Sequence, residues 1–448
     1  MSVINDPSPA EDLGSAPPLV HTPPPGPASR EWLNRHGRAG APMGPRPAAG
    51  APPQSIVLER GTGANVFDCD GNRYVDLAAG FGALLLGHSH PEVLLALEEQ
   101  SKLLLQALGD VYPSPSKIEL LERLSALYPG PARALLAQSG SDAISAALKT
   151  AVLHTGRAGV VAFSGAYHGL GYGPLAALGL RSSYREPFAA QLNPRVRFLE
   201  YPGTAAELEA VTTQLTAELG QGDVGAVLVE PILGRGGVVV PPADFLPRIS
   251  ELARRHGALC VADEVWTGLG RAGALLCSAG AMPDLICLGK GLGGGVPISA
   301  VIGRADVMQS WSREAEVVHT STFAGAPLAC AAALTTLDVL EREALSDRSR
   351  RLGDWFRVTL ERALAEVPVR SVVRGRGLML GVELLDSSDS RPGMGAALQR
   401  ALLARGYVTS SGGGRREVLV LTPPLTIAEA QLEGFVPELC ASLRGLAA

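Results

Sequence analysis

The chain has 448 residues, 46% of them apolar and 19% charged, which is typical of a globular protein large enough for one large and one small domain. The formal net charge of −5 argues against nucleic acid or an anionic membrane surface as a partner. No stretch reaches the roughly 18 apolar residues of a membrane span, and the first residues lack the layout of a signal peptide.

Cysteine and histidine usage indicates neither disulfides nor a metal site. None of the six cysteines forms a C-x-x-C pair, and several stand in apolar runs, so we expect reduced core residues of a cytoplasmic protein. His88 and His90 precede a predicted helix with no cluster of further ligands nearby, so we interpret them as structural.

The N-terminal region is rich in proline, because residues 1–53 hold 13 of the 34 prolines. We expect a disordered tail over residues 1–28 and a short helix over 29–36, capped by Ser29. Ordered structure is expected from about residue 54, where Asp70-Gly71 between two β-rich runs predicts a hairpin.

Further along, helices are predicted from Ser89, as an N-cap, and over 116–127. Strands and helices then alternate, which predicts βαβ units and an α/β fold. The expected strands cover residues 134–137, 160–163, 196–201, 224–230, 258–262, 285–288 and 298–302, and the helices between them cover 139–154, 205–219 and 245–256.

Two long helices, over 326–345 and 346–367, precede a second strand–helix pattern over 372–443. We therefore predict a large domain at 96–335. The flanking segments, 29–95 and 336–448, are expected to contribute to a small domain.

Lys290 stands in a glycine-rich stretch, PDLICLGKGLGGGV, directly after a short apolar strand. Only four of the chain's 39 basic residues are lysines, and the other three lie in helical patterns. Glycines allow a ligand to approach the backbone closely, and a lysine there can act as a nucleophile or form a Schiff base. A Lys-Gly pair that merely ends a strand is the alternative.

Several polar residues share the position of Lys290 at the carboxyl end of a predicted strand, where ligands bind in α/β sheets. They are Ser139-Gly140-Ser141, Tyr167-His168, Glu230 and Asp263. Pyridoxal phosphate needs such a set: a lysine, a carboxylate for its pyridine nitrogen and a helix N-terminus for its phosphate.

Eight motifs carry a family resemblance. They are DCDGNRYVDLAAGFGALLLGHSHP (68–91), QSGSDAISAALKTA (138–151), AYHG (166–169), VEPILGRGG (229–237), VADEVWTGLGRAG (261–273), LGKGLGGG (288–295), STFAGAPLACAAAL (321–334) and RGRGLMLGVEL (374–384). In this order the chain resembles the class III, ornithine/4-aminobutyrate type, aminotransferases of PLP fold type I. The resemblance implies a large domain with a mostly parallel seven-stranded sheet flanked by helices. It also implies a small α+β domain built from both chain ends.

The resemblance also implies roles for individual residues. Lys290 matches the Schiff-base lysine that carries the substrate proton, and Asp263 matches the carboxylate on the pyridine nitrogen. Val265 and Tyr167 match the residues on the two faces of the cofactor ring.

The phosphate site is implied at Gly140 and Ser141. Thr322 matches a threonine that reaches the phosphate of the neighbouring subunit, which implies a homodimer with shared active sites. Glu230 matches a glutamate near the cofactor, although Glu-Pro after a strand is equally explained as turn chemistry.

Three departures from the family pattern concern the substrate. Trp266 stands where the family often has glutamine, Arg235 where many members have glutamate, and Val420 where those members have a carboxylate-binding arginine. We hypothesise that Arg235 binds the substrate carboxylate, since a guanidinium offers bidentate geometry. The alternative is a surface arginine in a glycine-rich loop.

The function this implies is transfer of an amino group from an amino acid or amine to a keto acid or aldehyde. An amino-acid racemase or epimerase of the same family is the main alternative. Less favoured alternatives are an aminomutase, a decarboxylase and a non-enzymatic binding protein of this fold. The sequence names neither donor nor acceptor.

Overall fold

The computed structural model describes residues 14–42, 55–312, 316–386 and 389–447. Its largest sheet has seven strands in the order β4-β10-β9-β8-β7-β5-β6. The strands are β4 (Ala132–Ala137), β5 (Gly159–Phe163), β6 (Val196–Leu199), β7 (Val224–Val229), β8 (Leu259–Asp263), β9 (Leu285–Leu288) and β10 (Ser299–Arg304). Only β10 runs antiparallel to its neighbours in this sheet, so the predicted mostly parallel sheet is confirmed.

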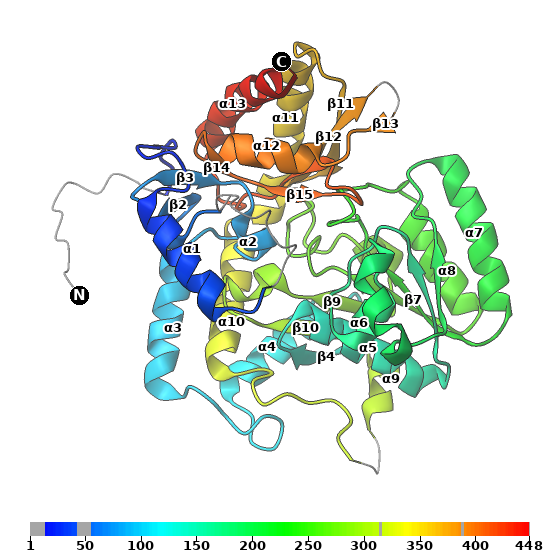
Figure 1. The fold of residues 1–448 in the computed structure, drawn as a ribbon. Coiled ribbons are helices and arrows are strands. Elements are labelled where there is room, and N and C mark those ends of the chain that lie inside the picture. Colours follow the sequence, from blue (N-terminus) through cyan, green and yellow to red (C-terminus); the bar gives the residue numbers. More distant parts are fainter. Residues whose placement is uncertain (1–13, 43–54, 313–315, 387–388, 448) are drawn as a thin grey trace.

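Helices cover both faces of this sheet, which explains why its central strands are continuous apolar runs. Ala226 and Leu228 of β7 pack in a cluster with α5 (Gly140–Thr155). The alternate residues Val227 and Val229 pack with α7 (Ala205–Gly220) and α8 (Phe245–Arg255). Figure 1 shows α7 and α8 together at one side of the sheet, with α5 in front.

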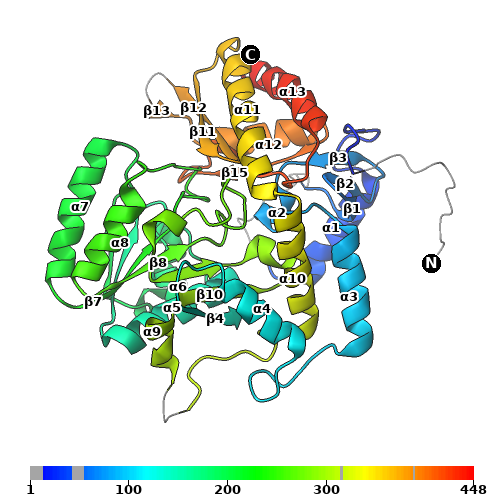
Figure 2. The same ribbon diagram turned by 180° about the vertical axis from the view of Figure 1, so that it is seen from behind.

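The smaller part of the molecule combines both ends of the chain. Strand β3 (Arg73–Asp76) pairs in parallel with β14 (Tyr407–Val408), in a sheet of order β1-β2-β3-β14. A second sheet has the order β11-β12-β16-β15, and the short strand β13 also pairs with β12. Figure 2 shows this second sheet and α11 to α13 on top of the large sheet, so the predicted small α+β domain is confirmed.

The remaining elements fill in these layers. The strands are β1 (Leu58–Thr62), β2 (Asn65–Asp68), β11 (Ser371–Arg376), β12 (Met379–Asp386), β13 (Asp389–Ser390), β15 (Ser410–Gly412) and β16 (Val418–Leu421). The helices are α1 (Pro27–Ala39), α2 (Ala79–Gly82), α3 (Pro91–Leu103), α4 (Pro115–Ser125), α6 (Tyr172–Ala176), α9 (Ala305–Met308), α10 (Pro327–Arg342), α11 (Leu345–Ala365), α12 (Met394–Leu403) and α13 (Glu429–Ala447). None of the described helices is both long and apolar enough to cross a membrane.

The N-terminal segment differs from its prediction. Residues 1–13 lie outside the described residues, but residues 14–28 of the expected disordered tail pack against the β2–β3 hairpin. Leu19 exchanges backbone hydrogen bonds with Arg73, and the Asn72 side chain accepts from two further backbone N–H groups. The hairpin side chains thus supply the hydrogen bonds that a proline-rich segment cannot make with itself.

Two predicted helix caps are also wrong, although both helices exist. Helix α1 begins at Pro27 after Gly26, and Ser29 is buried within its first turns, its N–H bound to Asp70. Helix α3 begins at Pro91 with His90 in the cap position, because Ser89 adopts a left-handed conformation one residue earlier.

Candidate active site

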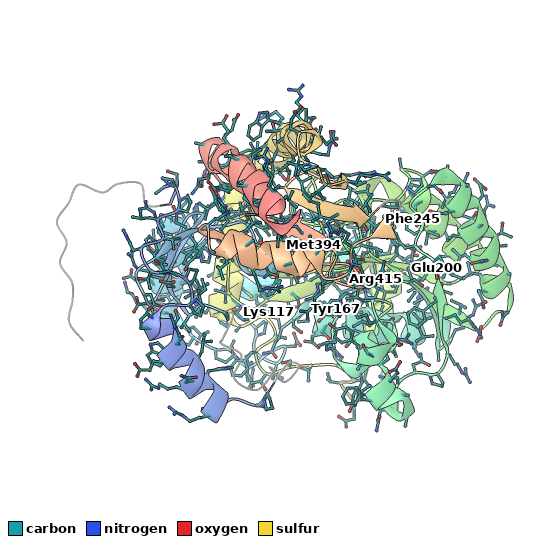
Figure 3. All side chains as sticks on the ribbon, turned by 45° about the horizontal axis from the view of Figure 1, so that its top comes forward. Lys117, Tyr167, Glu200, Phe245, Met394 and Arg415 are labelled. Carbon is teal, nitrogen blue, oxygen red and sulfur yellow. The ribbon has the colours of Figure 1, made fainter. Side chains whose placement is uncertain are left out.

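The structure brings the predicted residues together at one edge of the large sheet. Strands β4, β5, β7, β8 and β9 run in the same direction, so their carboxyl ends meet. The segments that follow them carry Ser139-Gly140-Ser141, Tyr167-His168, Glu230, Asp263 and Lys290. Tyr167 is labelled in Figure 3.

Lys290 begins a short 3₁₀ helix after β9, in a left-handed conformation with φ of 41° that is uncommon for a residue with a side chain. Its Nζ lies 4.6 Å from the centroid of the Trp266 ring. Burial lowers the pKa of the Lys290 amine; the charges of Asp263 and Glu230 oppose this effect and that of Arg235 adds to it. A neutral amine is the form that attacks a carbonyl.

Asp263 ends β8 and is held on both oxygens. Oδ1 accepts from the Val265 N–H at 3.1 Å, and Oδ2 lies 2.7 Å from Nδ1 of His168. Both side chains are buried, and Nε2 of His168 has no partner in the described part of the chain. No separate role was predicted for His168 from the sequence. Its place after β5, beside Tyr167, was the one available signal.

Glu230 follows β7 and is buried with both oxygens occupied. Its Oε1 accepts from the backbone N–H of Tyr167 at 2.7 Å, and Oε2 accepts from that of Gly234 at 2.9 Å. Burial raises the pKa of Glu230 to about 7; Asp263 also raises it, while His168 and the two N–H groups lower it.

Arg235 lies against Tyr167. The centre of its guanidinium is 5.1 Å from the Tyr167 ring centroid, and its buried Nε has no partner among the described residues. Its backbone carbonyl accepts from the N–H of Gly413, which lies between β15 and β16. This arginine is therefore not a freely moving surface side chain.

The N-terminus of α5 forms a cradle beside Lys290. Ser139 caps the helix by accepting from the Asp142 N–H at 3.2 Å, and the Ser141 hydroxyl accepts from the Gly171 N–H at 3.0 Å. A Cβ on Gly140 would lie 2.7 Å from a methyl group of Val265, so Gly140 allows Val265 to pack against the start of the helix. The first-turn N–H groups and the helix dipole favour an anion at this position.

Trp266 and Val420 form an apolar wall of the site. They pack in one cluster with residues of β12 and β16, and the indole of Trp266 lies between Gly82 and Gly234. A Cβ on either glycine would approach the indole to 2.4 Å. The indole Nε1 is buried and has no partner among the residues described.

Thr322 is not brought to this set by contacts within the chain. It is exposed, and its carbonyl oxygen accepts a hydrogen bond from the Gln106 side chain.

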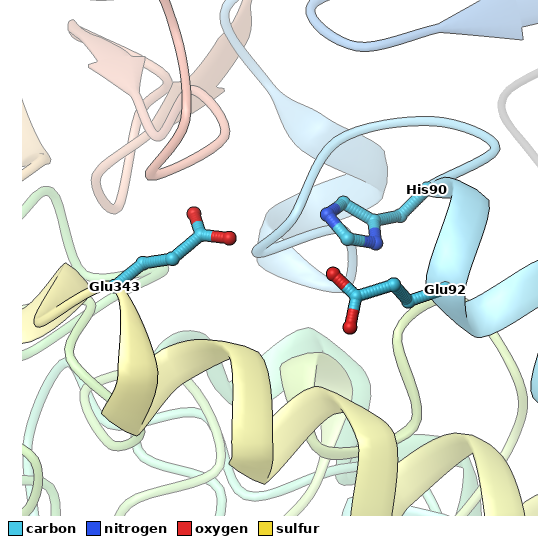
Figure 4. Close-up of side chains that lie close together, drawn as sticks. All are labelled: His90, Glu92 and Glu343. Carbon is cyan, nitrogen blue, oxygen red and sulfur yellow. The ribbon is translucent and has the colours of Figure 1, made fainter.

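One group of possible metal ligands lies elsewhere in the described chain. His90, Glu92 and Glu343 approach one another between the start of α3 and the end of α10 (Figure 4). Arg342 donates to both oxygens of Glu92, at 2.6 and 2.8 Å, and to Glu343 at 3.0 Å. Because a guanidinium already occupies both carboxylates, we assign no metal to this cluster.

The site residues fit pyridoxal phosphate. Lys290 offers an amine of lowered pKa, and Asp263 a buried carboxylate whose second oxygen is held by His168. The helix N-terminus at Gly140 offers N–H groups for a phosphate, and the missing side chain of Gly140 lets Val265 pack against the start of the helix.

Comparisons with known proteins agree with this geometry. Residues 47–443 match the family model described as aminotransferase class-III. The chain is 35% identical to 5-aminovalerate aminotransferase DavT of Pseudomonas aeruginosa, over 84% of this chain and 91% of that protein. It is 40% identical to acetylornithine aminotransferase of Mycobacterium bovis, over 88% and 92% of the two chains.

A solved structure is also similar. The PLP-bound amine transaminase from an uncultivated Pseudomonas species superposes with a TM-score of 0.84 at 29% identity, covering 90% of this chain and 97% of that one. These relatives transfer amino groups, which favours transamination over racemisation. The chain therefore belongs to the class III aminotransferases of PLP fold type I, enzymes that use pyridoxal phosphate to move an amino group from a donor to a keto acceptor.

Proposed function

We propose that this transaminase acts on substrates that carry a carboxylate, with Lys290 as the catalytic amine and Arg235 as the carboxylate-binding residue. When bound, pyridoxal phosphate supplies an aldehyde that captures the substrate nitrogen and a conjugated ring that accepts the electron pair released at Cα. The chain's own residues supply binding, orientation and proton transfer.

Lys290 holds and moves the proton. Because burial lowers the pKa of its amine, Nζ is available as a neutral base once it is free of the cofactor. With the cofactor bound, Nζ would take the proton from the substrate Cα and deliver it to C4′ of the cofactor, so that the amino nitrogen stays with the cofactor. The Trp266 ring, 4.6 Å away, limits the positions that Nζ can occupy.

Asp263 stabilises positive charge on the pyridine nitrogen. The Nδ1–H of His168 donates to Asp263 at 2.7 Å and the Val265 N–H donates at 3.1 Å, so the carboxylate is oriented before the cofactor binds. Preorganised charge in a buried site is stronger than the same charge in water. Val265 and Tyr167 would hold the cofactor ring between them.

Gly140 and Ser141 would hold the phosphate at the start of α5. Glu230 accepts from the backbone N–H of Tyr167 and would fix this residue beside the cofactor.

We propose a homodimer in which Thr322 of each chain completes the phosphate site of its partner. The exposed position of Thr322 supports this arrangement. A cytoplasmic location is proposed as well, since all six cysteines are free thiols.

The observation that carries the substrate proposal is the state of Arg235. Its guanidinium stacks on Tyr167, and its buried Nε lacks a partner among the described residues. A buried donor on a cation is costly unless an anion satisfies it, and a substrate carboxylate is the anion that reaches this site during turnover. Val420, at the position of the family's arginine, is buried in the apolar wall and offers no charge.

The test compares two substrates that differ only in the carboxylate: an ω-amino acid and the amine of the same chain length. Replacement of Arg235 by alanine should raise KM for the amino acid by about 10- to 150-fold, the equivalent of a charged hydrogen bond, and leave the amine nearly unchanged. The variant Arg235→Lys keeps the positive charge but loses the two-pronged guanidinium, so its KM for the amino acid should lie between those of the wild type and the alanine variant. Equal losses for both substrates, or no loss for either, would contradict the proposal.

A further inference from the structure

Glu230 joins two segments that are far apart in the sequence. One oxygen accepts from the N–H of Tyr167, after β5, and the other accepts from the N–H of Gly234, after β7. Both bonds go to backbone N–H groups and not to side chains. The side chain therefore works as a bridge between two backbone segments at the end of the large sheet.

One of the two bridged segments contains Tyr167 and the other contains Arg235, whose guanidinium lies over the Tyr167 ring. Tyr167 is held by its own N–H, and Arg235 immediately follows Gly234, the other residue held. On the opposite side, the carbonyl of Arg235 accepts from Gly413 at 2.8 Å. Glu230 and Gly413 thus fix the backbone on either side of Arg235, one from the large domain and one from the small domain.

We infer that Glu230 is a positioning residue for the substrate carboxylate: by holding Tyr167 and Gly234 together, it keeps the Arg235 guanidinium stacked on the Tyr167 ring. This inference rests on the proposed role of Arg235. It assigns Glu230 to substrate selection, since bidentate recognition of a carboxylate requires the guanidinium plane to be fixed.

The bridge depends on the charge of Glu230. A carboxylate can accept both N–H bonds, whereas the protonated acid has one oxygen that carries a proton and accepts poorly. Burial and the charge of Asp263 raise the pKa of Glu230 to about 7, and His168 opposes them; Lys290 and Arg235 also face this cluster. Lowering the pH through neutrality should therefore loosen the bridge and raise KM for carboxylate substrates.

The experiment is run on the holoenzyme with Glu230→Gln, which keeps the shape of the side chain but replaces one acceptor oxygen by an NH₂ group that cannot accept from an N–H. We expect KM for the ω-amino acid to rise about 3- to 10-fold relative to KM for the matched amine, the equivalent of one neutral hydrogen bond. The absorption spectrum of the bound cofactor is recorded alongside, because Glu230 also acts on the Lys290 amine through its charge. In the wild type, the KM for the ω-amino acid divided by the KM for the amine should rise as the pH falls from 8.5 to 6. In the variant, this KM ratio should not change with pH.

Glu264→Gln is the matched control. Glu264 is a neighbouring buried glutamate whose oxygens bind the Ser278 N–H and the Thr267 hydroxyl, away from Arg235. This change should leave the KM ratio as in the wild type.

Several results would overturn the inference. An altered cofactor spectrum with equal losses for both substrates would place Glu230 at the cofactor instead. A wild-type KM ratio that does not change between pH 6 and 8.5 would also refute it, and this measurement needs no variant to fold. If Arg235→Ala discriminates the two substrates but Glu230→Gln does not, only the positioning role fails. If Arg235→Ala does not discriminate, the proposed function fails first.

Discussion

Replacement of Gly140 by alanine should weaken cofactor binding through a collision with Val265. The added Cβ would lie 2.7 Å from Cγ1 and 3.0 Å from Cγ2 of Val265, whereas carbon atoms in contact are about 3.5–4.0 Å apart. Val265 must therefore move by roughly 0.5–1 Å from the position in which it would contact the cofactor ring.

Overpacking of this kind costs about 1–3 kcal/mol in a close-packed interior. If that cost falls on the cofactor-bound state, the dissociation constant of pyridoxal phosphate rises by about 5- to 150-fold. The assay is a titration of the apoenzyme with the cofactor, followed by the absorbance of the bound form. Thermal unfolding of the apoenzyme shows whether the protein itself is destabilised.

The double variant Gly140→Ala/Val265→Ala provides the control. Alanine at 265 removes both methyl groups that collide, so the double variant should bind the cofactor more tightly than Gly140→Ala alone. Wild-type affinity in the single variant, or a double variant whose losses simply add, would refute the packing argument.

Two further predictions concern Lys290 and Asp263, and a third concerns the packing of α11 against the turn between β11 and β12. The apoenzyme captures the cofactor through the neutral amine of Lys290, and burial lowers the pKa of this amine. The rate of capture should therefore level off at a pH below about 10.4, the pKa of an ordinary lysine. An inflection at or above that pH in a stopped-flow series would contradict this prediction. Asp263→Asn removes the charge held by His168 and should reduce kcat by about 10²- to 10³-fold, whereas a kcat within a few-fold of wild type would show that this charge is dispensable. Gly353→Ala would place a Cβ 2.0 Å from the Gly377 carbonyl oxygen and should destabilise the fold by about 1–3 kcal/mol in thermal unfolding; an unchanged Tm would disprove it.

Local sequence signals located most of the elements that build the site. Continuous apolar runs predicted β7, β8 and β9, because strands buried on both faces need no polar residues. Asp70-Gly71 predicted the hairpin, where Gly71 has a φ of 84°. The helix predicted over residues 139–154 is α5 (Gly140–Thr155), with Ser139 as its N-cap.

These local signals did not predict the direction of the strands or their order in the sheets. Strand β10 is antiparallel to both of its neighbours, β4 and β9, although it is buried like the parallel strands of the sheet and carries no signal of its direction. The parallel pairing of β14 with β3 joins residues more than 300 positions apart, and β14 was not predicted at all. Pairing between distant segments depends on the whole packing, and a two-residue strand leaves no periodic pattern.

The sequence alone therefore determined which residues stand at the ends of strands, and Lys290 and Asp263 followed from their position there. Only the tertiary structure decided what those side chains touch. His168 reaches Asp263 across 95 residues, and Glu230 links Tyr167 to the segment of Arg235 across 63 residues. Such contacts are set by the convergence of five strand ends, and no local pattern encodes a partner that folding brings from another part of the chain.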